Sequence, residues 1–173
     1  MPCRHTREYW SMVIVLMGVA GAGKTTVGRR LSEQLQWAFL DGDAVHPPEN
    51  IAKISSGVPL SDDDRRPWLD ALRRSIAEWI AQDRDGVVAC SLLKQAHRAA
   101  VLTGAASHAK LVYLRASSEL LEARLTTRTG HFAGVALLNS QLADLEEPRD
   151  ALVLDASQTP DHLVHTIRRA WDL

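Results

Sequence analysis

The segment Gly18–Thr25 carries the strongest chemical signal in the sequence. It reads Gly-Val-Ala-Gly-Ala-Gly-Lys-Thr and lies between an apolar run and a helical pattern. This is the spacing of a phosphate-binding P-loop, in which backbone N–H groups face a phosphate and the following helix adds its positive end. Lys24 would reach the β- and γ-phosphates, and Thr25 would offer its hydroxyl to Mg²⁺. A glycine-rich turn that only joins a strand to a helix would explain neither the Lys-Thr pair nor the spacing.

A second polar group follows the next apolar run, with the sequence Asp41-Gly-Asp43-Ala-Val-His46. In an open α/β sheet, ligands bind at the carboxyl ends of the strands, and this group would lie at that edge beside the P-loop. Asp41 and Asp43 would point in different directions if strand geometry persists. One could then face metal or substrate while the other supports the loop. The alternative is a polar loop in which both aspartates only bind local backbone amides.

Two further charged groups lie near the same predicted edge. The first is Asp-Asp-Asp-Arg-Arg-Pro at residues 62–67, where we expect a helix to begin at Pro67, since proline fits the first helical turn and disfavours helical geometry in the residue before it. The acids could serve only as helix caps. The second follows the third apolar run and contains Ser91, Lys94 and Arg98, of which Ser91 could do no more than cap a helix.

Arg124 and Arg128 are spaced one helical turn apart, so that both guanidinium groups can emerge on one helix face. Gly130 and His131 follow directly, and the glycine permits a mobile lid near residues 124–136. Closure would bring positive charge to a transferring phosphoryl group. A solvated helix face is the alternative explanation for such an arginine pair.

These residues must be positioned by alternating strands and helices. We expect short apolar strands at residues 12–17, 38–41, 87–91, 110–114 and 151–154, and helices at about 24–35, 67–81, 95–102, 118–128, 137–145 and 160–171. This alternation predicts an α/β fold, with a parallel five-stranded sheet and helices on both faces. The length of 173 residues fits a single domain, which we place at residues 12–173 after a leader at 1–11.

Composition excludes several classes of protein. The 20 basic and 21 acidic residues give a formal net charge of -1, which is not the basic field of a general nucleic-acid binder. Cys3 and Cys90 are too few for a disulfide framework or a thiolate zinc site, and a reduced thiol at Cys90 fits a reducing cytoplasm. The longest apolar run falls far short of the roughly 20 residues of a membrane span, and no secretory signal is recognisable.

Taken together, these motifs resemble the gluconate kinase (gluconokinase) family of small P-loop carbohydrate kinases. The resemblance extends from about Val13 to Asp155. It rests on the segments LMGVAGAGKTT, FLDGDAVHPPENIAKISSGVPLSDDDRRPWL, CSLLK with the later Arg98, RLTTRTGHF and LLNSQLADLEEP. The chain departs from the family at Ala20 and Ala22, where serines are usual, and at Leu92 and His97, where alanine and tyrosine are frequent.

The resemblance implies transfer of the γ-phosphoryl group of ATP to the 6-hydroxyl of D-gluconate, within a P-loop NTPase-type fold that has a small mobile lid. It implies Mg²⁺ as the metal and a homodimer as the assembly. Asp43 would accept the hydroxyl proton, Lys24 and Arg128 would stabilise the phosphoryl charge, and Asp41 would lie nearer the water shell of the metal. The residues that would hold ATP are Gly18, Gly21, Gly23, Lys24, Thr25, Thr26, Arg124 and Arg128. The residues that would hold gluconate are Asp41, Asp43, His46, Arg65, Lys94, Arg98 and His131.

Two other hypotheses remain open at this point. A kinase of another small hydroxylated metabolite, such as shikimate, would share the P-loop and the lid but would not need this combination of Asp41, Asp43 and the acidic segment 62–64. A regulatory module that binds nucleotide without transferring phosphate would show no acceptor-dependent release of ADP. Adenine would be recognised near residues 155–160, where the sequence singles out no particular side chain.

Overall fold

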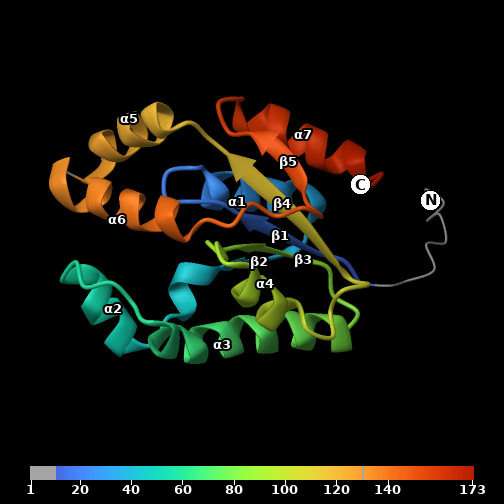
Figure 1. Ribbon diagram of the computed structural model, residues 1–173. Helices are drawn as coiled ribbons and strands as arrows, with labels where there is room; N and C mark the ends of the chain where they lie inside the picture. Colours follow the sequence, from blue (N-terminus) through green and yellow to red (C-terminus); the bar gives the residue numbers. More distant parts are fainter. Residues whose placement is uncertain (1–10, 130) are drawn as a thin grey trace, which may run out of the picture.

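The computed structural model describes the backbone of residues 11–129 and 131–173, and the side chains of this range except those of residues 128–136. Five parallel strands form one sheet in the order β2-β3-β1-β4-β5 (Figure 1). They are β1 Val13–Met17, β2 Ala38–Asp41, β3 Gly86–Ala89, β4 Ala109–Arg115 and β5 Leu152–Asp155. The predicted α/β fold with a five-stranded parallel sheet is therefore confirmed, with every strand within about two residues of its expected bounds.

Helices cover both faces of this sheet, as predicted (Figure 1). One face packs against α1 Lys24–Leu35 and α7 Pro160–Ala170, and side chains of α5 Ser118–Thr129 and α6 His131–Asp144 enter the same core. The opposite face packs against α3 Asp62–Ala81 and α4 Gln95–Leu102. Strand β1 supplies both cores, because successive side chains point to opposite faces: Ile14 and Leu16 enter the first core, and Val15 and Met17 enter the second.

The start of α3 corrects one expectation. The predicted start at Pro67 is wrong, because the helix begins five residues earlier, at Asp62. Ser61 caps it: its side chain accepts a hydrogen bond from the backbone N–H of Asp64, and the Asp64 carboxylate accepts one from the N–H of Ser61. This reciprocal capping box nucleates the helix ahead of the proline, which then lies inside it. The acids are therefore part of the helix and do not precede it.

Two short elements after β2 were not expected. They are a 3-10 turn, η1 Gly42–Val45, and a helix, α2 Pro48–Ser55. Pro48 stands in the first turn of α2, where its missing N–H costs nothing. Helix α6 also begins at His131, six residues before the expected start at Leu137. These elements stand at one end of the sheet, with α2 on one side and the α5–α6 pair on the other (Figure 1).

The proposed leader falls mostly outside the described residues, which begin at Ser11. Ser11 itself is buried, and its carbonyl oxygen lies 2.8 Å from Nδ1 of His108, so this residue is packed into the domain. Cys90 is a fully buried free thiol, as expected. Within the part of the chain that the structure describes, no helix is both long and apolar enough to cross a bilayer.

Candidate active site

The P-loop lies between β1 and α1, where its spacing predicts it. Gly23 caps α1 with a φ of 96°, a left-handed conformation that disfavours any residue with a Cβ. Gly18 has a φ of 149°, and a Cβ there would also stand 2.8 Å from the carbonyl oxygen of Leu114 on β4. Gly21 completes the turn with a φ of 83°. The glycines thus build a loop at the N-terminus of α1, the arrangement that binds phosphate through backbone N–H groups.

Lys24 folds back over this loop. Its Nζ donates a hydrogen bond to the carbonyl oxygen of Val19 at 3.0 Å. Burial lowers the pKa of Lys24, while the negative charges of Asp43 and Asp41 oppose that shift. The ammonium thus lies against the P-loop and within electrostatic reach of the two aspartates that follow β2, where a transferring phosphoryl group would need a cation.

Asp41 and Asp43 have different surroundings, as their alternation predicts. One Asp41 carboxylate oxygen accepts a hydrogen bond from the hydroxyl of Thr25 at 3.0 Å, and the other accepts one from the backbone N–H of Asp43 at 3.2 Å. Asp41 thereby joins the P-loop helix to the start of η1, so a purely local turn does not describe it. The Asp43 residue is exposed. The oxygen atoms of Thr25 and Asp41 are of the kind that Mg²⁺ prefers, and their proximity fits a magnesium ion in this corner.

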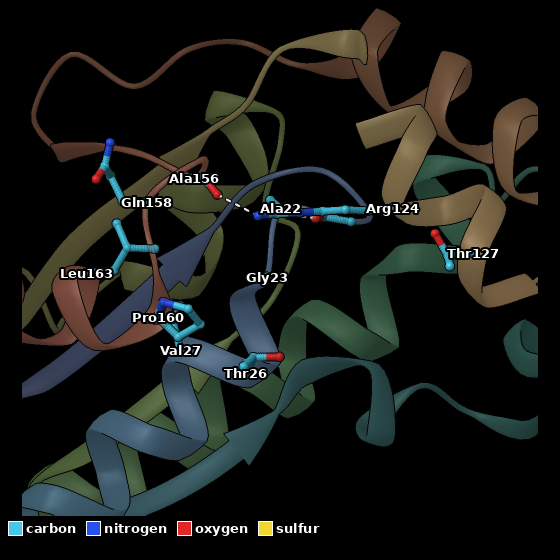
Figure 2. Close-up of a pocket in the computed structure, with 11 residues that line it drawn as sticks. Ala22, Gly23, Thr26, Val27, Arg124, Thr127, Ala156, Gln158, Pro160 and Leu163 are labelled. Carbon is cyan, nitrogen blue, oxygen red and sulfur yellow. Dashed lines mark hydrogen bonds between the residues drawn. The ribbon is translucent and has the colours of Figure 1, made fainter. Parts of the chain in front are cut away.

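A cavity of about 380 Å³ opens beside the P-loop (Figure 2). Its walls are Gly21, Ala22, Gly23, Thr26, Val27, Arg124, Thr127, Ala156, Gln158, Pro160 and Leu163. Three of these residues belong to the segment 155–160, where we expected adenine recognition. The cavity is lined partly by apolar side chains and partly by backbone, which suits a flat base attached to phosphates.

Arg124 crosses this cavity (Figure 2). Its Nη1 donates to the carbonyl oxygen of Gly21 at 3.2 Å, and its Nη2 donates to that of Ala156 at 2.9 Å. The alternative of a solvated helix face is therefore wrong for Arg124, which ties α5 to the P-loop and to the loop after β5. Arg128 lies one turn further along α5, and His131 begins α6. Their side chains fall outside the described set, so their roles and the lid at 124–136 stay predictions.

On the other side of the P-loop, His46 follows η1 and stacks on the indole of Trp68, with ring centroids 4.6 Å apart and an angle of 10° between the planes. Trp68 is buried, and its Nε1–H donates to the carbonyl oxygen of Gly42 at 2.7 Å. Burial lowers the pKa of His46. The negative charge of Asp43 opposes this shift, and the positive charge of Arg65 adds to it. The sequence analysis did not single out Trp68 as a site residue. Its position directly after Pro67, inside one of the segments that carry the family resemblance, was the available signal.

Arg65 and Lys94 lie in one cluster of charges, together with Asp62 and Asp144. Arg65 is 3.3 Å from each of the two carboxylates, and Lys94 is 3.1 Å from Asp62 and 3.8 Å from Asp144. The cluster joins the N-termini of α3 and α4 to the C-terminus of α6. Sequence reasoning missed Asp144, because nothing near it in the chain points to a partner 79 residues away.

Arg98 has a different position from the one expected of a substrate ligand. It is buried, and its Nη1 donates to the carbonyl oxygens of Leu92 and Leu93 at 3.0 and 2.7 Å. Leu92 has a φ of 37°, an unfavourable conformation for a branched side chain, and the arginine holds that turn. This geometry favours a role in shaping the loop that carries Lys94. Ser91 caps no helix, because the N-cap of α4 is Lys94.

Comparison with known proteins identifies the family of this chain. Residues 13–148 match the family described as AAA domain. The chain is 39% identical over 156 residues to the thermoresistant gluconokinase of Escherichia coli, covering 88% of this chain and 89% of that protein. It is 44% identical over 137 residues to the gluconokinase of Gluconobacter oxydans, covering 79% and 76%. The chain belongs to the gluconokinase family.

Solved structures agree with this assignment. The crystal structure of a gluconokinase from Sinorhizobium meliloti superposes with a TM-score of 0.80 at 41% identity, covering 90% of this chain and 89% of that one. The fold is shared more widely, since a Mycobacterium tuberculosis APS kinase superposes with a TM-score of 0.68 at only 17% identity. The predicted resemblance to gluconokinases and the P-loop kinase fold are both confirmed.

Proposed function

We propose that the chain is an ATP-dependent gluconokinase, which transfers the γ-phosphoryl group of ATP to the 6-hydroxyl of D-gluconate and yields 6-phosphogluconate and ADP. The observation that carries the proposal is the placement of Lys24, Thr25 and Asp41 around one corner of the P-loop, in a chain of the gluconokinase family. The cavity beside the P-loop would take the nucleotide and the polar side chains after β2 would take the acceptor, so that both substrates would meet at this corner.

Phosphoryl transfer needs mainly positioning and charge stabilisation, with no covalent enzyme intermediate. The P-loop N–H groups and Lys24 would hold the β- and γ-phosphates. Asp43 would orient the 6-hydroxyl and accept its proton as the bond to phosphorus forms. Arg128 would add positive charge as the lid closes, which also excludes water from the reacting phosphoryl group.

Gluconate would bind beside the P-loop, next to His46, Arg65 and Lys94. A guanidinium group suits the carboxylate of an aldonic acid, because it can donate two parallel hydrogen bonds. Arg98 would act through the loop that it holds, and His131 would approach from the lid. The residues proposed for ATP are those of the P-loop together with Thr26, Arg124 and Arg128.

Mg²⁺ would be held by the Thr25 hydroxyl, with Asp41 near its water shell. When bound, the ion would neutralise charge on the β- and γ-phosphates. We also propose a homodimer in the cytoplasm, without nucleic-acid or membrane partners. The reduced, buried thiol of Cys90 supports a reducing compartment, the net charge of -1 argues against nucleic acid, and the dimer rests on the family resemblance.

A panel of acceptors tests the proposal directly. ADP release and the phosphorylated product are measured together with gluconate, other aldonic acids, shikimate and nucleosides, each with and without Mg²⁺. We expect ADP release that depends on both gluconate and Mg²⁺. Equal rates with and without gluconate would exclude gluconate as the acceptor. Activity with shikimate alone would favour the second kinase hypothesis, and nucleotide binding with no acceptor-dependent release would favour a regulatory module.

A further inference from the structure

Asn50 on α2 is one of the few buried polar residues of the described chain, with only 3% of its surface exposed. Its Nδ2 donates a hydrogen bond to the backbone carbonyl oxygen of Asp64 at 2.7 Å. A carbonyl oxygen can only accept, so this contact fixes which end of the Asn50 side chain is the nitrogen. The orientation of the amide is therefore set by the backbone at the start of α3.

The same Nδ2 faces His46, whose Nδ1 lies 3.4 Å away. An amide nitrogen has two hydrogens and no lone pair to offer, so Nδ1 must be the acceptor in this contact. A neutral imidazole with a lone pair on Nδ1 carries its proton on Nε2. A proton on Nδ1 would instead meet an N–H group, and this contact would be lost.

The remaining sides of the His46 ring are also defined. One face stacks on Trp68, which is itself anchored to Gly42 at the start of η1. No hydrogen bond to Nε2 is found among the side chains and backbone that the structure describes. The charged groups that influence the ring are Asp43 from η1 and Arg65 from α3, and burial lowers its pKa, which favours the neutral form.

We propose that Asn50 is a positioning residue that fixes the Nε2–H tautomer of His46, so that His46 presents a hydrogen-bond donor to a hydroxyl or carboxylate oxygen of the acceptor. This inference rests on the proposed function for the identity of that acceptor. It assigns a role to Asn50 and Trp68, neither of which carries chemistry of its own. The stack sets the plane of the ring, and the amide sets which nitrogen donates.

Nitrogen NMR tests the tautomer without any activity measurement. The full chain is labelled with ¹⁵N-histidine, and the signals of His46 among the seven histidines are identified by their absence in His46→Gln. At neutral pH we expect a lone-pair shift for Nδ1 and a protonated shift for Nε2. In Asn50→Leu the two shifts should move toward each other as the tautomers mix. A wild-type protein with the proton on Nδ1, or with both nitrogens protonated, would overturn the proposal even if Asn50→Leu failed to fold.

Steady-state kinetics test whether the Nε2–H group of His46 binds the acceptor. The amide nitrogen of glutamine reaches the place of Nε2, whereas that of asparagine reaches only the place of Nδ1. We therefore expect the KM for gluconate to be roughly tenfold higher in His46→Asn than in His46→Gln, the effect of about one hydrogen bond, with the KM for ATP unchanged. The matched control is His165→Gln on the exposed side of α7, which should change neither constant.

Equal KM values in His46→Asn and His46→Gln would show that the Nε2 donor does not bind the acceptor, and would overturn the proposal. An absence of gluconate-dependent ADP release in the wild-type chain would instead contradict the proposed function. In that case the NMR spectra would still decide whether Asn50 fixes the tautomer, so the two failures are distinguishable.

Discussion

The two sides of the candidate active site are built differently. The phosphate side is one continuous segment, Gly18–Thr25, shaped by left-handed glycines and by the N-terminus of α1. The acceptor side is assembled from η1, α2, α3, α4 and α6, and its shape depends on contacts between side chains, such as the stack of His46 on Trp68. A backbone cradle binds any phosphate of the right geometry, whereas side chains from five elements can be matched to one acceptor. Under the proposed function, phosphate binding and the choice of acceptor would therefore depend on separate parts of the chain.

Substitution of Lys24 should give the largest effect. Lys24→Met keeps an unbranched side chain but removes the cation that faces the phosphates, and we expect single-turnover transfer to fall by about 10²–10³-fold. Lys53→Met is the comparison on the acceptor side, where Lys53 pairs with Asp64 at 2.7 Å. Lys53→Met should lower the single-turnover rate far less than Lys24→Met. Similar rates in the two variants would contradict the assignment of Lys24, and circular dichroism checks that both remain folded.

The two aspartates come next. Asp43→Asn preserves size and polarity but cannot accept the hydroxyl proton, and we expect the chemical step to slow by about 10²-fold with little change in ATP affinity. Asp41→Asn should mainly raise the concentration of Mg²⁺ needed, because Asp41 contacts the Thr25 hydroxyl. Single-turnover rates and Mg²⁺ titrations separate the two. Full rate in Asp43→Asn together with a lost rate in Asp41→Asn would reverse the assignments.

Arg128→Ala tests the lid. An arginine that stabilises charge mainly in the transition state should, when removed, lower gluconate-dependent turnover at least roughly tenfold and change ATP affinity less. Arg128→Lys retains the charge but loses the planar fork, so it should recover only part of the rate. Arg74→Ala, on the exposed side of α3, is the control. An unchanged rate in a folded Arg128→Ala protein would remove this residue from the site.

The smallest effect should come from the cap of α3. Ser61→Ala removes the acceptor for the N–H of Asp64 and should lower the free energy of unfolding by about 1 kcal/mol. Thr159→Ala removes the corresponding cap of α7 and should cost a similar amount. Only Ser61→Ala should also raise the KM for gluconate, because α3 carries Arg65 and Trp68. Chemical denaturation and steady-state kinetics are measured on both variants. Equal KM values for gluconate in the two variants would show that the cap of α3 does not affect acceptor binding.

The phosphate side could be predicted from the sequence because its signals are local. Gly18, Gly23 and Lys24 are close neighbours in the chain, and an apolar strand before them fixed their place. The acceptor side could be predicted only in part. His46, Arg65 and Lys94 were found as residue types at a sheet edge, but the partners that hold them, Asn50 among them, depend on contacts between separate elements.

The misplaced start of α3 has a different origin, because here two local sequence rules compete. The preference of proline for the first helical turn predicted a start at Pro67. The capping box formed by Ser61 and Asp64 starts the helix earlier. The pattern Ser-x-x-Asp was visible in the sequence, although the usual residue at its last position is Glu or Gln. Helix α2 carried a signal as well, in Pro48 followed by Glu49, that was not used.

The double contact of Arg124 has a consequence for the entropy of nucleotide binding. Because its guanidinium already links Gly21 of the P-loop to Ala156 of the loop after β5, the two walls of the cavity are fixed relative to each other by the fold itself. The loss of conformational freedom in these loops then belongs to folding and not to the encounter with ATP. Arg124→Ala should therefore make nucleotide binding entropically less favourable, and the difference should appear in calorimetric titrations as a changed balance of enthalpy and entropy.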